Sequence, residues 1–164
     1  MTRIQAPMET LRETVRAEWT DYNGHMNLAY FVLVFDLATD GFYADFGLGE
    51  DYCRRTNHST FAVESHTAYL AELHEGAALR CTTQLLGFDD KRMHYFHHMY
   101  REEDGVLAAT MELMAVHVDL AVRKVRPMPD EVQDRLGRIF LAHAALERPP
   151  QLGRVMQLGG AGGK

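Results

Sequence analysis

The sequence predicts an α+β fold, in which an antiparallel sheet wraps around one long central helix and a second helix follows near the C-terminus. Three observations support it. Residues 27–46 are apolar around nearly the whole helical circumference, which is typical of a buried helix. From Ser59 onward the hydrophobic period changes to two, which indicates strands. Turn residues divide that later region into four segments of similar length, as in successive hairpins.

The first elements are a strand, a polar turn and the long helix. Residues 10–19 alternate loosely and are expected to form a strand at a sheet edge. Residues 21–25 form the turn. Asn27 is the expected N-cap of the helix, and Gly47 is its expected C-terminal stop.

The remaining elements are a loop, four strands and a closing helix. Residues 47–58 are expected to form the loop. The expected strands cover residues 59–70, 78–88, 91–101 and 106–119. Pro129 is suited to the first turn of the closing helix. The stripe that packs this helix down consists of Val132, Leu136, Ile139 and Phe140. A single sheet leaves edges and a face open, so we expect a partner subunit to cover or extend it.

Length and composition indicate one domain. The chain has 164 residues, of which 46% are apolar and 24% charged, as in an ordinary globular protein. We assign residues 1–146 to the domain and expect residues 147–164, which contain Pro149-Pro150 and end in a glycine-rich run, to form a flexible tail. Residues 1–12 lack the pattern of a signal peptide, and no apolar run has the roughly 18–20 residues that span a bilayer. A cytoplasmic protein without a membrane partner is therefore expected.

Charge and cysteine content exclude two further classes. The net charge of −6 lacks the basic character of nucleic-acid-binding domains, so we expect no nucleic-acid partner. The two cysteines, Cys53 and Cys81, are too few for a disulfide framework or a four-cysteine zinc site. We interpret both as small buried apolar residues.

The turn before the long helix has residues suited to catalysis. Gly24 permits a left-handed backbone, and the next amides, of His25, Met26 and Asn27, are expected to be unpaired at the positive end of the helix. Such amides suit a developing oxyanion. Asp21 lies close enough to act as a nucleophile or as a general base for water. In the alternative interpretation Asp21 only caps the turn and His25 is an ordinary loop histidine.

This motif, Asp21, Gly24, His25, Asn27 and Tyr30 ahead of an apolar helix, resembles the hotdog-fold acyl-CoA thioesterases of the 4-hydroxybenzoyl-CoA thioesterase type. The resemblance spans about residues 10–129, and it includes Glu64-Ser65-His66 and the Val118-Asp119, Arg123-Lys124 and Pro127 ending. It implies the hotdog fold and hydrolysis of acyl-CoA without a metal or other cofactor, coenzyme A being part of the substrate. It also implies a homodimer or homotetramer with active sites between subunits.

The same resemblance implies roles for the motif residues. Asp21 is then the base or nucleophile, and the amides after Gly24 form the oxyanion hole. His25 is a positioning residue in the same loop.

A finer similarity is to the thioesterases of carnitine breakdown, including the domain fused to some L-carnitine dehydrogenases. It lies in residues 19–25, 38–40, 84–87 and 90–94. The implied substrate is betainyl-CoA, whose acyl group carries a quaternary ammonium. Trp19, Tyr22 and Tyr30 offer π-faces worth about 0.5–2 kcal/mol each to a caged cation, and the candidate counter-charges are Asp36, Asp40 and Glu64. The alternative is an aryl or a short or medium fatty acyl group, with these aromatic residues in the core.

Asp36 and Asp40 are four residues apart, so they share one helix face. In another branch of the hotdog thioesterases a helix carboxylate is the catalyst, so the resemblance makes Asp36 a second candidate for the catalytic carboxylate. The alternative is that both aspartates are only solvated or hydrogen-bonded. The phosphates of coenzyme A require basic residues, for which the candidates are Lys91, Arg92, Arg123 and Lys124, with Arg54-Arg55 as a third possibility.

Two competing functions and a metal site are less favoured. Among the nine histidines, His97 is expected to face away from His94 and His98, and these two with His117 complete no regular zinc pattern, so no metal is expected. Hotdog hydratases and dehydratases have active-site motifs that contain a proline, and residues 21–25 lack it, so this alternative class is less favoured. A non-catalytic coenzyme A-binding protein is the remaining alternative.

Overall fold

The computed structural model describes residues 4–158. Its elements, in chain order, are β1 (Met8–Thr14), a 3₁₀ turn η1 (Ala17–Trp19), α1 (Leu28–Phe46), α2 (Glu50–Thr56), β2 (His58–Tyr69), β3 (Ala78–Phe88), β4 (Arg92–Arg101), β5 (Leu107–Asp119), β6 (Lys124–Val125) and α3 (Asp130–His143). The order and the type of the long elements confirm the sequence prediction.

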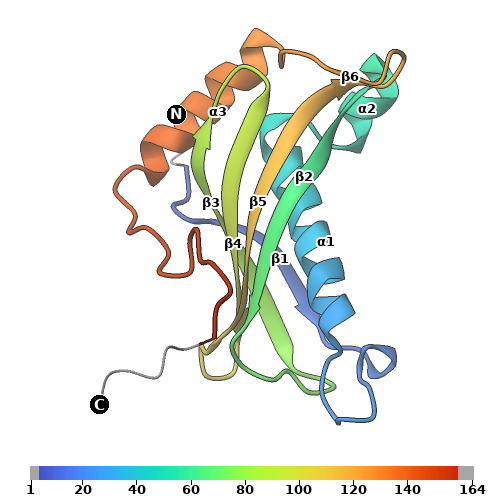
Figure 1. Ribbon diagram of the computed structural model, residues 1–164, viewed down its shortest axis with the longest axis vertical. Coiled ribbons are helices and arrows are strands. Elements are labelled where there is room, and N and C mark those ends of the chain that lie inside the picture. The colour runs from blue at the N-terminus through green and yellow to red at the C-terminus, as the bar shows by residue number, and fades with distance from the viewer. Residues whose placement is uncertain (1–3, 159–164) are drawn as a thin grey trace.

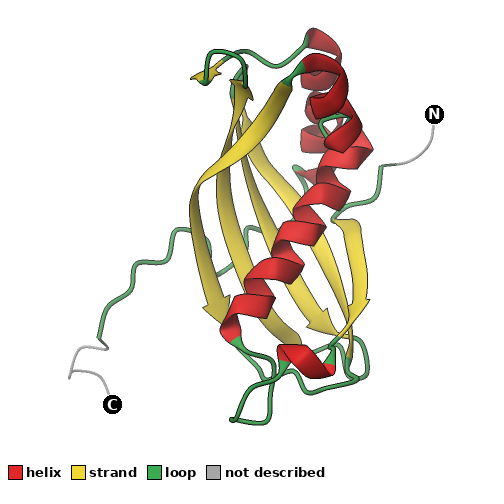
Figure 2. Ribbon diagram, turned by 90° about the vertical axis from the view of Figure 1, so that its right-hand side faces the viewer, coloured by secondary structure: helices red, strands yellow, loops and turns green. Residues whose placement is uncertain are grey.

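All strands belong to one antiparallel sheet that curls around α1 (Figures 1 and 2). The strand order is β1-β3-β4-β5-β2, and the short β6 pairs with the end of β5. β2 and β1 are therefore the two edges. In the described chain β2 pairs only with β5, so its other side is open. With 12 residues, it is a long edge strand. α3 lies near β3, at the end of the sheet where α1 terminates.

Helix α1 begins and ends where the sequence indicates. The Asn27 Oδ1 accepts a hydrogen bond from the Ala29 amide (3.0 Å), and Gly47 closes the helix in the left-handed conformation (φ 90°). The helix is not buried on all sides, however. Leu28 is 61% exposed and Val32 42%, so the prediction of burial around the whole circumference is wrong for a single subunit. The face turned away from the sheet is open.

Two local predictions differ from the structure. The first strand covers Met8–Thr14, and residues 17–19 turn away from it in a 3₁₀ helix. Residues 47–58 include a helix, α2, where a loop was expected. The helix is stabilised by the buried Tyr52, whose hydroxyl donates to His117 Nε2 on β5 (2.9 Å), because His117 Nδ1 carries the proton that it donates to the Arg126 carbonyl. This tertiary contact stabilises a segment too short to show helical periodicity.

A chain of hydrogen bonds crosses the core between α1 and the sheet. Thr39 Oγ1 donates to the Phe35 carbonyl, so His97 Nε2 donates to Thr39 (2.9 Å) and His97 Nδ1 accepts from Thr83 Oγ1 (2.8 Å). Thr83 in turn meets Thr10 Oγ1 of β1 (2.9 Å). His97 is fully buried, and burial lowers its pKa to about 3, so it is neutral.

The close approach of α1 to β1 depends on a glycine. A Cβ atom built on Gly41 would lie 2.2 Å from the Thr10 carbonyl oxygen, which no side chain tolerates. Gly41 therefore lets the helix rest directly on the strand backbone.

The face of the sheet that turns away from α1 is covered by the end of the chain. The Gly153 amide donates to Glu112 on β5 (2.7 Å), and Gln84 on β3 donates to the Glu147 carbonyl (3.3 Å). The chain after α3 thus contacts the sheet at Glu147 and Gly153, whereas the side chains of residues 154–158 are exposed. The expected glycine-rich end, residues 159–164, lies outside the described residues. Within residues 4–158 no helix is long and apolar enough to cross a membrane.

Candidate active site

The loop that precedes α1 folds back on itself as a tight turn. The Gly24 amide donates to the Asp21 carbonyl (2.9 Å), and the Asp21 amide donates to the His25 carbonyl (3.2 Å). Gly24 takes φ 80°, a conformation that side chains with a Cβ rarely adopt. The turn therefore brings Asp21 next to the Gly24–His25 peptide, as the motif predicts.

Asp21 is held by two donors. Asn27 Nδ2 donates to Oδ2 (2.8 Å) and the Asn23 amide donates to Oδ1 (2.8 Å). The hydrogen bond from Asn27, followed by that from Asn23, lowers the pKa of Asp21 below its ordinary value. Asp21 is thus a carboxylate at neutral pH, it is partly exposed, and each oxygen keeps a lone pair for chemistry.

The amides after Gly24 differ from the expectation. The Met26 amide donates to the Leu73 carbonyl (2.7 Å), and the Asn27 amide donates to the Trp19 carbonyl (2.8 Å). The expectation that these two amides are unpaired is therefore wrong: the segment after β2 pairs with Met26, and the 3₁₀ turn before the loop pairs with Asn27. The His25 amide makes no hydrogen bond within residues 4–158, so it alone of the three is free to meet an oxyanion.

The His25 side chain lies between the loop and the segment after β2. Its Nδ1 approaches the Met26 carbonyl (3.2 Å), and its Nε2 lies 3.8 Å from Glu72 Oε1. The ring therefore contacts both the loop and the segment after β2, and its positioning role stays a prediction.

A pocket of about 320 Å³ opens beside this loop. It lies between the start of α1 and the end of β2, and its lining is His25, Met26, Leu28, Phe31, Tyr69, Leu70, Ala71 and Glu72. The rings of Phe31 and Tyr69 meet edge to face, with centroids 5.3 Å apart. Sequence reasoning missed Tyr69 and Glu72, because they line the pocket beside His25 only through the contact of the end of β2 and the segment after it with the start of α1.

The three aromatic residues proposed as a cage do not all come together, because only two of them are in contact. Trp19 is 3% exposed and stacks on Tyr30 (centroids 5.8 Å apart), and the Arg16 guanidinium lies 4.8 Å from the centre of its ring. Tyr22 is 98% exposed at the tip of the turn. Trp19 and Tyr30 thus serve the packing of the loop.

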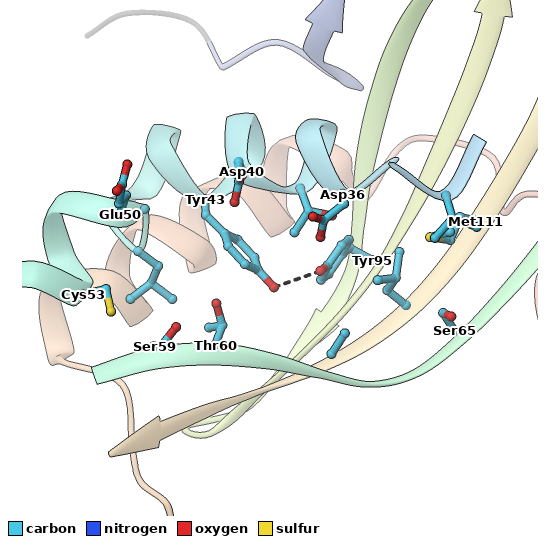
Figure 3. A pocket seen from close by; sticks show the side chains of 16 residues that line it. Asp36, Asp40, Tyr43, Glu50, Cys53, Ser59, Thr60, Ser65, Tyr95 and Met111 are labelled. Atoms are coloured by element: carbon cyan, nitrogen blue, oxygen red, sulfur yellow. Dashed lines mark hydrogen bonds between the residues drawn. The ribbon is translucent and has the colours of Figure 1, made fainter. Parts of the chain in front are cut away.

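Asp36 and Asp40 lie in a second, larger pocket of about 450 Å³ between α1, α2 and β2 (Figure 3). Glu50 of α2 also lines it, and a hydrogen bond of 2.8 Å joins the hydroxyls of Tyr43 and Tyr95 there. Burial, and then the neighbouring Asp36, raise the pKa of Asp40. Asp36 is eight residues beyond the start of α1, or about 12 Å along its axis. In one subunit these aspartates are therefore well separated from Asp21.

Glu64 lies on the other face of the sheet. A bulge between Ala62 and Glu64 shifts the pairing with β5, so Ala62 opposes the buried Ala115 and Glu64 opposes Met114. Glu64 then lines a pocket under residues 153–155, with His66 and His94. Because of this extra residue, Ala62 and Glu64 lie on opposite faces of the sheet, although strand alternation alone would place them on one face.

The basic candidates gather at one end of the sheet. Lys124 pairs with Asp119 across β5 and β6, and the Lys91 carbonyl accepts from the His117 amide (2.8 Å). Arg92 is bound by Asp89 of its own turn (2.6 Å); Arg123 is exposed. This end is opposite the loop of Asp21 in one subunit, since α1, about 28 Å long, separates them (Figure 1).

The histidines have separate roles. His97 faces the core, whereas His94 and His98 lie on the opposite face of β4, as predicted. His94 Nε2 meets Glu112 Oε1 (2.7 Å), and His117 meets Tyr52. In residues 4–158 no three potential ligands come close enough to hold a metal ion.

Comparison with known proteins identifies the family. The model of the thioesterase-like superfamily matches residues 15–136. The chain belongs to this superfamily. A betainyl-CoA thioesterase of Pseudomonas aeruginosa is 40% identical over 151 residues, covering 92% of this chain and 95% of the relative. An L-carnitine dehydrogenase/betainyl-CoA thioesterase of a Rhizobium species is 38% identical, and the match covers 92% of this chain but 30% of that longer protein.

A solved structure supports the same placement. A Staphylococcus aureus protein determined in complex with CoA superposes with a TM-score of 0.87, at 26% identity, covering 96% of this chain and 99% of that one. The hotdog fold and the family expected from the sequence are confirmed. The enzyme class, a thioester hydrolase, is confirmed as well, because the named relatives of this thioesterase-like chain are thioesterases.

Proposed function

We propose that this thioesterase-like protein hydrolyses betainyl-CoA, with Asp21 as the catalytic carboxylate. The observation that carries the assignment of the site is the turn before α1, where an ionised Asp21 lies beside the His25 amide, which has no acceptor within the described part of the chain. The similarity to betainyl-CoA thioesterases over nearly the whole chain supports the substrate.

In the proposed reaction the thioester carbonyl accepts a hydrogen bond from the His25 amide. That amide stabilises the negative charge that develops on the carbonyl oxygen. Asp21 then either removes a proton from the attacking water or attacks the carbonyl itself, with a mixed anhydride that water hydrolyses. In both routes the carbon–sulfur bond breaks, and the products are the free acid and the thiol of coenzyme A. No step requires a metal or a further cofactor.

The acyl group is proposed to enter the pocket beside His25. In betainyl-CoA a single methylene separates the trimethylammonium from the thioester carbonyl, so the cation must lie close to Asp21. Asp36 and Asp40 of the same subunit are too far along α1 for this role. The Tyr69 ring and the Glu72 carboxylate line the nearer pocket, and they offer a π-face and a counter-charge.

We further propose that the active unit is at least a dimer, formed through β2. Phe61 and Val63 are 40% and 58% exposed on this strand, which pairs on one side only within the described chain, and the exposed Val32 of α1 lines a pocket together with β2 residues. A two-fold axis through β2 reverses the second subunit. The loop of Asp21 in one subunit then meets the basic end of the other, which would supply cations for the phosphates of coenzyme A.

Thiol release from a panel of acyl-CoA substrates tests the function. The panel contains betainyl-CoA, its neutral isostere 3,3-dimethylbutyryl-CoA, 4-hydroxybenzoyl-CoA, and short and medium fatty acyl-CoA. We expect betainyl-CoA to have the highest kcat/KM, and the isostere to be at least about 10-fold poorer because only the charge differs. A better aryl or fatty substrate would overturn the betaine assignment and leave the thioesterase class intact.

The role of Asp21 is tested on the best substrate of that panel. Asp21→Asn should lower kcat by about 10²-fold or more, whereas Asp134→Asn, an exposed aspartate on α3, serves as the matched control and should retain activity. If Asp36→Asn abolishes turnover and Asp21→Asn does not, the carboxylate on α1 is the catalyst.

A further inference from the structure

The segment between β2 and β3 supports the loop of Asp21 at three consecutive residues. Glu72 lies 3.8 Å from His25 Nε2, the Leu73 carbonyl accepts from the Met26 amide, and His74 Nδ1 lies 3.0 Å from the Gly24 carbonyl oxygen. Arg101 anchors this segment from β4 by donating to the Glu72 carbonyl (3.0 Å). The loop is thus held by chain that is remote in sequence.

The contact of His74 fixes a particular peptide group. A carbonyl oxygen can only accept a hydrogen bond, so His74 Nδ1 carries a proton and donates a hydrogen bond to the Gly24 carbonyl oxygen. The carbonyl of Gly24 and the amide of His25 belong to the same planar peptide unit, in which the N–H and C=O bonds point in opposite directions. A hydrogen bond that holds the carbonyl therefore also sets the direction of the His25 N–H.

We propose that His74 is a positioning residue, which orients the Gly24–His25 peptide so that the His25 amide meets the oxyanion. Gly24 is free to rotate this peptide, since it has no Cβ and nothing lies within 4 Å of where one would be. The His25 amide donates to no acceptor among the residues that the structure describes, so no hydrogen bond of its own fixes the plane. The inference rests on the proposed thioesterase function and adds a residue that acts through the backbone, without touching the substrate.

Substitutions that keep or remove the donor test the proposal. Asn places an amide N–H at the position of the histidine Nδ1, whereas Gln places it near Nε2, and Ala removes it. Removing one oxyanion-hole donor lowers kcat about 10²–10³-fold, and misaligning the donor should lower kcat by a smaller factor. We therefore expect His74→Ala and His74→Gln to lower kcat about 10-fold at nearly unchanged KM, and His74→Asn to retain kcat within about threefold.

The controls separate this proposal from a structural effect and from failure of the function. Glu75→Ala, an exposed neighbour in the same segment, should leave kcat and KM unchanged. Wild-type kcat in His74→Ala, or equal losses in the Asn and Gln variants, would overturn the positioning role while thioesterase activity stands. If the wild type releases no thiol from any substrate of the panel, the proposed function itself fails.

Discussion

Replacing Gly41 by alanine should destabilise the protein although alanine is the better helix former. Within α1 the change gains about 0.5–1 kcal/mol from helix propensity. The new Cβ, however, would lie 2.2 Å from the Thr10 carbonyl oxygen, and the atom it meets is backbone that cannot rotate away. To reach ordinary contact, α1 and β1 must separate by roughly 1 Å, and overpacking of this kind costs about 1–3 kcal/mol.

The clash should exceed the gain in propensity, because the displaced elements carry core residues such as Phe35 and Phe42, which are fully buried. We expect a net loss of about 1–2 kcal/mol in the free energy of unfolding. For a chain of this size that corresponds to a fall in Tm of about 2–8 °C.

Gly137→Ala is the matched control. Gly137 lies inside α3, and the nearest atom to an added Cβ is Phe88 Cζ at 3.9 Å, an ordinary contact. This variant should gain the propensity term and raise Tm by about 1–4 °C. Urea and thermal unfolding at one protomer concentration measure both variants. If Gly41→Ala is as stable as Gly137→Ala, the reasoning from the close approach is refuted.

Three further predictions concern the core, the loop and the sheet edge. His97 stays neutral in the fold, with a pKa of about 3, whereas the unfolded state protonates this histidine below about pH 6.5. As the pH is lowered from 6 to 4, the free energy of unfolding should therefore decrease by up to about 1.4 kcal/mol per pH unit. His97→Gln should flatten this pH dependence in urea titrations, and equal slopes for the variant and the wild type would contradict the prediction. Asn27→Ala should cost about 1 kcal/mol as a lost cap and raise the pKa of Asp21, which moves the acidic limb of kcat/KM to higher pH; an unmoved limb would exclude that link. Val63→Asp should convert the proposed dimer to monomers in sedimentation equilibrium and lose turnover, whereas Val122→Asp, an exposed valine at the β5–β6 turn, should do neither; a dimer unaffected by Val63→Asp would place the interface elsewhere.

Local signals predicted most of the fold. Asn27 and Gly47 mark the ends of α1 through side-chain capping and a left-handed residue, both readable from neighbouring positions. The period of two defined β3, β4 and β5, and the family motif located Asp21. These features depend on a few adjacent residues, so one sequence is sufficient for them.

Features that depend on distant contacts were not predictable in this way. The pairing of Met26 with Leu73 removes an amide from the expected oxyanion hole, and no property of the loop reveals it. The bulge after Ala62 reverses the face of Glu64 without a glycine or proline to mark it. α2 forms because Tyr52 finds His117 across the fold. In each case the deciding partner lies far along the chain.

The hydrogen bonds of His97 divide α1 into two halves with different freedom to change. An apolar helix packed against an apolar sheet can adopt several rotations about its axis, because contacts between apolar side chains differ little in energy from one rotation to another. Thr39 meets His97 at only one of these rotations, so the polar contact selects it. The opposite half, which carries Val32, Asp36 and Asp40, does not take part in this selection of the helix rotation. Substitutions on the outer half of α1 should therefore leave the rotation of the helix against the sheet unchanged, because Thr39 and His97 continue to set it.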